Sequence, residues 1–111
     1  TESMAKFCDT PVWNSKLNRK MWEYYLQGAE EKSLLDLGDS ELGEMPTTYI
    51  ETAEFDCLRD EGNELARILE SAGVATTHIK TKGTMHGFDM AQRSEITKYQ
   101  IAERCKWLGE W

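Results

Sequence analysis

Apolar residues recur at helical spacing in two segments of the chain. After Asn14 and Ser15, either of which can cap a helix, apolar side chains repeat every three or four residues until Gly28 offers a stop. A second repeat fills residues 58–72 and is followed by Gly73, which can adopt the left-handed conformation that ends helices. The pattern predicts an amphipathic helix in each segment.

Two short runs have the composition of β-strands. Residues 47–53 follow Pro46 and are dense in β-branched and aromatic side chains, and residues 76–81 alternate weakly around Ile79. Because the helix over 58–72 lies between them, we predict a right-handed βαβ unit with parallel strands. Parallel sheets usually contain more than two strands and are covered on both faces. The expected fold class is therefore α/β, with a sheet that is incomplete in this chain.

The remaining segments show weaker patterns. Residues 1–13 have no clear period, and residues 29–44 mix acidic side chains with glycines, which indicates a loop with room for one helical turn. A last helix is expected to begin at Ser94 and to carry its apolar side chains on one face. These side chains are Ile96, Ile101, Cys105 and Leu108. We divide the chain into an N-terminal helix and loop region, 1–45, and a βαβα portion, 46–111.

The charge of the chain limits the classes of partner. It has 20 acidic residues against 13 lysines and arginines, a net charge of -7, so phosphate backbones and anionic lipids would repel it. No apolar run approaches the roughly 20 residues that cross a bilayer, and no signal peptide is evident at the N-terminus. We expect a cytoplasmic protein that has no membrane span and binds no nucleic acid.

Cysteines and histidines show no metal-binding spacing. Cys8, Cys57 and Cys105 are odd in number and form no CxxC pair, so we expect free thiols rather than disulfides or a zinc site. Clustered histidine spacing is also missing, and we expect neither metal nor cofactor. His78 lies in a polar strand and is expected to be exposed.

Two loops carry the residue types of a catalytic site. Each follows a predicted strand, and the carboxyl ends of parallel strands lie at one edge of the sheet, where α/β proteins place their sites. Asp56 lies in the first loop and His86 in the second, so the two side chains should meet. In acyl transfer a histidine takes the proton of the nucleophile and returns it to the leaving group, while a carboxylate orients the imidazole.

Both residues also have a purely structural interpretation. Asp56 can cap the helix that begins near Leu58, and taken alone we would favour that role, because aspartate is common at such positions. His86 can be a packed loop histidine, although Gly87 beside it suits a close approach of the backbone to a partner. The combination of Asp56 with His86 favours catalysis.

The stretch from residue 45 to 89 resembles the end of the hormone-sensitive-lipase-like carboxylesterases, a branch of the α/β-hydrolases. In that family a strand leads into a D-P-L-x-D-E-G loop and a later loop reads H-G-F; here the loops read DCLRDEG and HGF. The resemblance implies that Asp56 and His86 are the acid and base of a Ser-His-Asp triad acting on carboxylic esters. Cys57 departs from the pattern by replacing proline. The helix with Trp22 is similar to the segment beside the lid and acyl pocket.

The family's nucleophile is missing from the sequence. The resemblance implies an upstream H-G-G-G loop and a G-D-S-A-G-G elbow, and neither occurs. Ser40 in GDSELG is a poor match, because Leu42 replaces a required glycine and Pro46 follows too soon for the next helix. Since the chain starts at Thr1, we expect that a preceding part has been removed. We predict the C-terminal portion of an esterase or lipase, inactive alone; the alternative is a non-catalytic fragment that forms a homo-oligomer through its exposed sheet edge.

Overall fold

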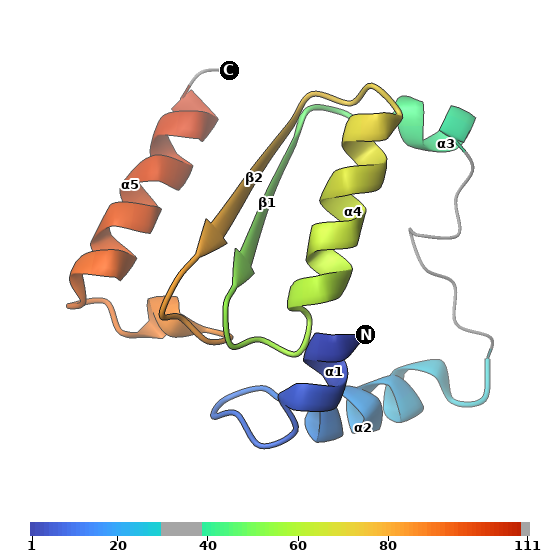
Figure 1. Ribbon diagram of the computed structural model, residues 1–111, viewed down its shortest axis with the longest axis vertical. Helices are drawn as coiled ribbons and strands as arrows, with labels where there is room; N and C mark the ends of the chain where they lie inside the picture. The colour runs from blue at the N-terminus through green and yellow to red at the C-terminus, as the bar shows by residue number, and fades with distance from the viewer. Residues whose placement is uncertain (30–38, 110–111) are drawn as a thin grey trace.

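The computed structural model describes residues 1–29 and 39–109 (Figure 1). Strands β1 (Thr48–Ala53) and β2 (Thr76–Thr81) form a parallel two-stranded sheet within the described residues. Thr48 lies opposite Thr76 in the register. Helix α4 (Arg59–Ser71) connects the strands and packs on both of them. The predicted parallel βαβ unit is confirmed, and the loops that follow the two strands lie at the same end of the sheet.

Helix α4 forms because one of its faces is apolar and buried. Ala66 and Leu69 are buried on this face, and Leu69 packs with Leu42 and Val74 in a small hydrophobic core. Gly73 adopts a φ of +83°, so the chain turns back and the Val74 N–H donates to the Leu69 carbonyl at 3.0 Å. The end predicted for this helix is confirmed. Burying a leucine side chain contributes about 2 kcal/mol, so Leu69 is a main anchor of the helix.

The N-terminal region contains the predicted helix α2 (Ser15–Leu26) and an additional one. The Asn14 side chain caps α2 by accepting from the Leu17 N–H at 3.1 Å, and Gln27 ends it in the left-handed region. The additional helix, α1 (Glu2–Lys6), packs on α4 (Figure 1). Five residues are too few to show a helical period, which is why the sequence pattern did not reveal α1.

Short helices complete the described part. Helix α3 (Asp39–Gly43) is the helical turn predicted within 29–44, and residues 30–38 of that prediction lie outside the described residues. A 3-10 helix, η2 (Phe88–Met90), follows the His86 loop.

The proposed boundary between 1–45 and 46–111 stays a prediction. Within the described ranges no helix is long and apolar enough to span a bilayer.

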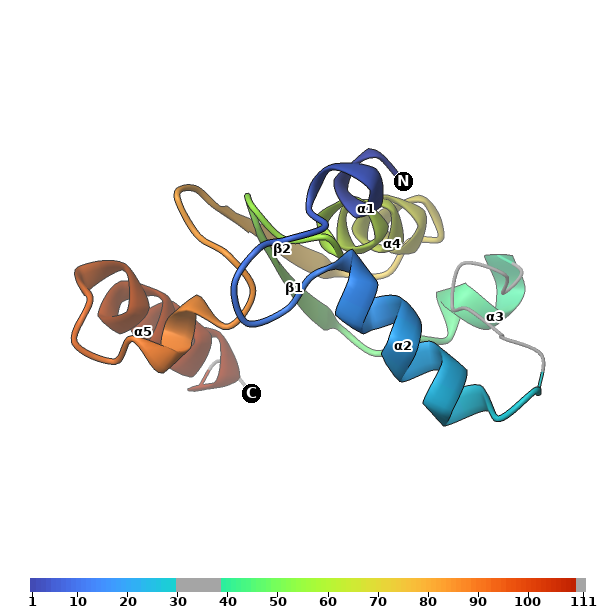
Figure 2. The same ribbon diagram turned by 90° about the horizontal axis from the view of Figure 1, so that it is seen from below.

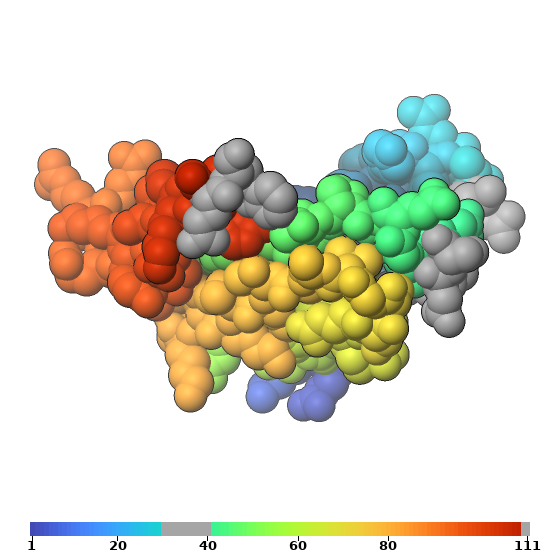
Figure 3. Space-filling view, turned by 90° about the horizontal axis from the view of Figure 1, so that it is seen from above, coloured from blue at the N-terminus to red at the C-terminus, as the bar shows by residue number. Residues whose placement is uncertain are grey.

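Helix α5 (Glu95–Gly109) begins where predicted, because the Ser94 hydroxyl accepts from the Thr97 N–H at 3.2 Å. The expected apolar face is not its buried face, however. Thr97 and Gln100 are buried, whereas the side chains of that face are exposed: Ile96, Ile101, Cys105 and Leu108. Helix α5 lies at one end of the molecule, away from α3 and α4 (Figure 3). It packs on η2, and its Arg104 and Trp107 side chains contact β1. The Thr97 hydroxyl donates to the Phe88 carbonyl of η2 at 3.2 Å, so the buried face of α5 is the one that meets η2.

Candidate active site

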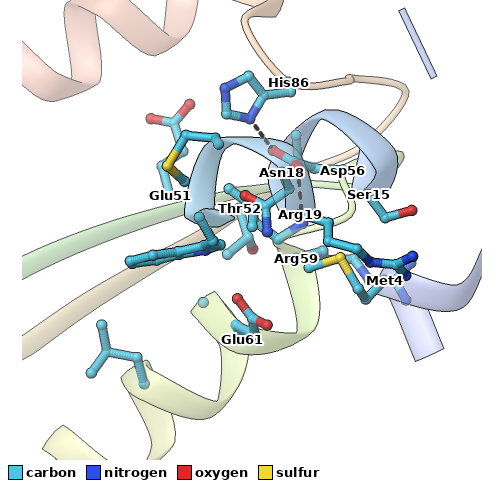
Figure 4. Close-up of a pocket in the computed structure, with 16 residues that line it drawn as sticks. Met4, Ser15, Asn18, Arg19, Glu51, Thr52, Asp56, Arg59, Glu61 and His86 are labelled. Carbon is cyan, nitrogen blue, oxygen red and sulfur yellow. Dashed lines mark hydrogen bonds and ion pairs between the residues drawn. The ribbon is translucent and has the colours of Figure 1, made fainter. Parts of the chain in front are cut away.

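Asp56 and His86 meet at the end of the sheet where both strands finish (Figure 4). His86 Nδ1 lies 2.8 Å from Asp56 Oδ2. A carboxylate can only accept hydrogen bonds, so Nδ1 is the donor and Nε2 keeps a free lone pair in the neutral ring. Within residues 1–29 and 39–109 no side chain hydrogen-bonds Nε2. The structure thus brings the two predicted site residues together and leaves one imidazole nitrogen available.

Asp56 is held rigidly by the start of α4. Its second oxygen, Oδ1, accepts from the Leu58 N–H at 3.0 Å. Its own N–H donates to the Ala53 carbonyl at 3.3 Å, and its carbonyl accepts from the Arg59 N–H at 3.2 Å. One oxygen therefore organises the turn into the helix while the other holds His86. The catalytic role of Asp56 stays a prediction, whereas its bond to the Leu58 N–H is part of the turn that leads into α4.

Ser3 ties helix α1 to the loop that carries Asp56. The Ser3 side chain is completely buried; its hydroxyl donates to the Cys57 carbonyl at 2.8 Å and accepts from the Asp60 N–H at 3.1 Å. The Ser3 N–H donates to Asp60 Oδ2 at 2.7 Å. Burial acts to raise the pKa of Asp60, but Ser3 and Arg59, 2.9 Å away, outweigh it and the pKa is lowered. Ser3 was missed by the sequence analysis, because its partners lie 50 or more positions away.

The two site loops are also joined to each other. Backbone pairing continues past the strands, with the Glu54 N–H on the Thr81 carbonyl at 3.1 Å and the Phe55 N–H on the Thr84 carbonyl at 2.9 Å. Thr84 is buried, and its hydroxyl donates to the Thr81 carbonyl at 2.9 Å. These bonds set the separation of the loops, so Asp56 and the His86 segment leave the sheet in a defined geometry.

An ion-pair cluster holds the segment that follows His86. Arg104 of α5 donates to both carboxylate oxygens of Glu51, at 2.9 and 2.8 Å, and to Asp89 Oδ2 at 2.9 Å. The two carboxylates raise the pKa of Arg104, and Arg104 in turn lowers the pKa of Asp89. Since Glu51 lies on β1 and Asp89 on η2, Arg104 clamps the histidine segment to the sheet. We refer to Glu51, Asp89 and Arg104 as the arginine clamp.

Cys57 and His78 are poor candidates for chemistry. Burial, assisted by Asp56, raises the pKa of the Cys57 thiol to about 11, so the thiol is neutral at physiological pH. His78 is half-buried rather than exposed as predicted, because its Nε2 lies 3.1 Å from the Thr52 hydroxyl on β1. Burial and then Lys80 lower its pKa. Among the described residues no group of three or more histidine, cysteine and acidic side chains is placed to hold a metal ion.

A cavity of about 800 Å³ opens beside the Asp56–His86 pair (Figure 4). Helices α1, α2 and α4 and strand β1 form its wall, and charged side chains such as Arg19 and Glu61 lie among apolar ones. The apolar side chains include Met4, Met21, Trp22, Leu58 and Leu65. Trp22 therefore lines a space next to His86, whereas Tyr24 and Tyr25 on the same helix are exposed.

Helix α3, which contains Ser40, lies away from this cavity. It packs near the end of α4 at Ala72, whereas Asp56 lies at the beginning of α4 (Figure 1). A nucleophile elbow requires a sharp turn between a strand and a helix, and no strand precedes α3 within the described residues. Helix α3 therefore lacks the strand–turn–helix context of a nucleophile elbow within the described residues.

Comparison with known proteins identifies the family. A model of the α/β-hydrolase fold matches residues 1–90. Bovine arylacetamide deacetylase is 39% identical over 101 residues, which is 91% of this chain and 25% of that protein. Bovine neutral cholesterol ester hydrolase 1 is 34% identical over 106 residues, or 90% of this chain and 26% of that protein.

Solved esterase structures share the fold described above. A bacterial heroin esterase superposes with a TM-score of 0.85 at 34% identity, over 93% of this chain and 35% of that one. The esterase LipW from Mycobacterium marinum gives 0.93 at 28% identity, over 99% and 36%. The chain spans about a quarter of the curated relatives, at 25% and 26% of their lengths. It belongs to the hormone-sensitive-lipase-like branch of the α/β-hydrolase family, as its two loops predicted.

Proposed function

We propose that the protein containing this chain hydrolyses carboxylic esters through an acyl-enzyme, with His86 as general base and acid and Asp56 as the carboxylate that orients it. The observation that carries the proposal is the 2.8 Å contact between His86 Nδ1 and Asp56 Oδ2 beside an open cavity. The nucleophilic serine is proposed to lie outside these 111 residues. The supporting facts are that no strand precedes helix α3, which contains Ser40, within the described residues, and that the relatives are about four times as long.

The proposed reaction uses the free Nε2 of His86 twice. Nε2 takes the proton of the serine hydroxyl as its oxygen bonds to the acyl carbon, and gives that proton to the alcohol as the ester C–O bond breaks. A water molecule then attacks the acyl carbon, Nε2 takes its proton, and the proton returns to the serine oxygen as the acid leaves. Asp56 stabilises the imidazolium in both halves, and its burial strengthens this interaction.

The proposed substrate class is a small carboxylic ester with an apolar group. The apolar side chains of the cavity suit such a group, and the charged ones suit the polar end of the molecule. The relatives are named for arylacetamides, cholesterol esters and heroin, which also supports an ester or amide carbonyl as the reacting group. Lipase activity and a cytoplasmic location stay predictions.

The alternative function is a non-catalytic unit that self-associates. In the described part of the chain β1 pairs only with β2, which leaves its other edge open. An open strand edge can pair with a second copy. This alternative would lead if the expressed protein had the mass of these 111 residues alone and formed dimers or larger species in light scattering.

The test is hydrolysis of p-nitrophenyl esters by the complete gene product, after its intact mass is measured. We expect His86→Gln to lower kcat by a factor on the order of 10⁶, because the general base is lost. His78→Gln is the matched control and should retain activity, since His78 lies on β2 and contacts Thr52 rather than the cavity. Equal activity of His86→Gln and the parent would remove the proposal.

A further inference from the structure

The connection between α1 and α2 passes across the end of the sheet beside the His86 segment (Figure 2). Trp13 lies in this connection, and its ring centroid is 5.9 Å from that of His86, with the two planes inclined by 32°. Its neighbour Val12 reaches the next residue of the same segment: a Cβ added to Gly87 would lie 3.3 Å from Val12 Cγ1. Two consecutive residues therefore contact His86 and Gly87.

The backbone at Val12 adopts an unusual conformation that presents Trp13 to His86. Val12 has a φ of +68°, which is rare for a β-branched residue. The Trp13 N–H donates to the Pro11 carbonyl at 2.8 Å, so Val12 is the centre of a tight three-residue turn. Strained turns of this kind persist only where the surroundings hold them, and they concentrate at functional sites.

Hydrogen bonds also hold Trp13 in place. The indole N–H donates to Asn18 Oδ1 at 3.2 Å, and Asn18 is buried on α2. The Trp13 carbonyl accepts from the Thr10 hydroxyl at 2.8 Å, while the Asn14 side chain donates to the Thr10 carbonyl at 3.1 Å. Both the ring and the backbone of Trp13 are thus held by contacts that do not involve His86.

We infer that Trp13 is a positioning residue for His86: its indole ring holds the imidazole against Asp56 and covers one face of the pair. This inference rests on the proposed function of His86. Asp56 restrains only one nitrogen of the imidazole, so the ring could still swing about that hydrogen bond. No other aromatic ring contacts His86 in the part of the chain that the structure describes. A flat aromatic neighbour also stabilises a cation that forms beside it, as the imidazolium does during acyl transfer.

The kinetic test uses two substitutions at Trp13 in the complete gene product. Trp13→Leu keeps an apolar side chain but removes the flat ring, and we expect kcat to fall about 10-fold with KM changed less than about twofold, the size of a strong aromatic contact with a cation. Trp13→Phe keeps a ring and should retain kcat within about threefold. Trp107→Leu is the matched control, because Trp107 packs on Tyr49 rather than near His86, and should leave kcat and KM unchanged.

A second measurement reads the contact without using activity. With ¹³C-labelled histidine, the Hε1 resonance of His86, assigned through His86→Gln, should move in Trp13→Leu and stay in place in Trp107→Leu. An unmoved resonance in Trp13→Leu would overturn the inference, as would unchanged kcat in that variant or an equal loss in Trp13→Phe. If Trp13→Leu does not fold, Trp13→Phe still tests the inference, because its kcat must stay within about threefold of the parent's. If the resonance moves but the complete gene product has no esterase activity, the contact between Trp13 and His86 is real but the proposed function is wrong. The positioning role then falls with the proposed function.

Discussion

The loops that carry Asp56 and His86 adjoin each other, yet they are supported differently. The Asp56 side chain is 12% exposed, whereas that of His86 is 38% exposed. Asp56 receives most of its bonds from the turn into α4, and Ser3 reinforces this turn. His86 depends on distant elements, since Asp56 contacts one nitrogen, Trp13 covers a face and the arginine clamp holds the following segment.

This difference suits the separate tasks proposed for the two residues. A carboxylate that orients a histidine acts best when it is rigid and shielded from water, because its interaction with the imidazolium is then strong. A histidine that exchanges protons with a serine and a leaving group must stay accessible to both. Local backbone structure can provide the first property, but only tertiary contacts can position a partly exposed side chain.

Among substitutions that change the support of His86 but keep the histidine, the largest effect is expected from Asp56→Asn. The amide can still accept from the Leu58 N–H but can also donate to His86, which favours the wrong imidazole tautomer. We expect kcat to fall by about 10⁴-fold with little change in KM, by analogy with the same change in a serine protease. Steady-state kinetics on a p-nitrophenyl ester measure this. Asp60→Asn is the control. It should lower the melting temperature but leave kcat close to that of the parent, because Asp60 binds Ser3 and Arg59 rather than His86.

Breaking the arginine clamp should mainly lower the stability of the protein, with a smaller effect on the loop that carries His86. Arg104→Met leaves Glu51, whose side chain is only 11% exposed, without its charge partner. We expect a loss of about 2 kcal/mol in the free energy of unfolding, less than for a fully buried pair because Arg104 is partly exposed. Urea denaturation gives this value. Arg67→Met removes an exposed pair with Glu64 and should have no measurable effect; equal losses in the two variants would argue against the clamp.

A smaller loss of stability is expected from Gly62→Ala, near the start of α4 and close to Asp56 in the sequence. A Cβ at this position would lie 2.6 Å from Thr52 Cγ2, so the Thr52 side chain or the helix would have to shift. We expect a loss of about 1–2 kcal/mol in the free energy of unfolding, since overpacking outweighs the helical preference for alanine. Gly109→Ala in α5 is the matched control, because no residue of the described ranges outside its own neighbours lies within 4 Å of the added Cβ, and it should be neutral or stabilising.

The smallest effect is expected on the pH dependence of stability, through Asp89 in the segment that follows His86. Arg104 lowers the pKa of Asp89 below its usual 3.8, so the contribution of Asp89 to stability is complete above that value and is lost as the pH falls through the lower folded pKa. The Asp89→Asn variant should therefore lose less stability than the parent as the pH falls below about 4, where carboxyl groups titrate. Thermal melts over this range measure it, and parallel curves for the two proteins would contradict the assignment.

Much of the site could be predicted because its parts are encoded locally. The strand over 48–53, the helix with its stop at Gly73 and the strand over 76–81 each have their own period or composition, and a βαβ unit then brings Asp56 and His86 to one edge. The buried face of α5 could not be predicted in this way. Thr97 is buried because it faces η2, whereas within the described residues α5 reaches the sheet through the long side chains of Arg104 and Trp107, and its apolar residues remain exposed.

What the sequence by itself determined is the order of elements and the placement of an acid and a histidine directly after two parallel strands. Local periodicity and turn residues carry this information, and the short distance along the chain leaves little freedom for the loops. Only the tertiary structure decided which distant side chains support the pair. Ser3 bonds Asp60 across 57 positions and Arg104 bonds Glu51 across 53, and Trp13 reaches His86 through a turn strained at Val12. Such contacts arise when packed elements bring single residues together, and a single residue leaves no period in a sequence.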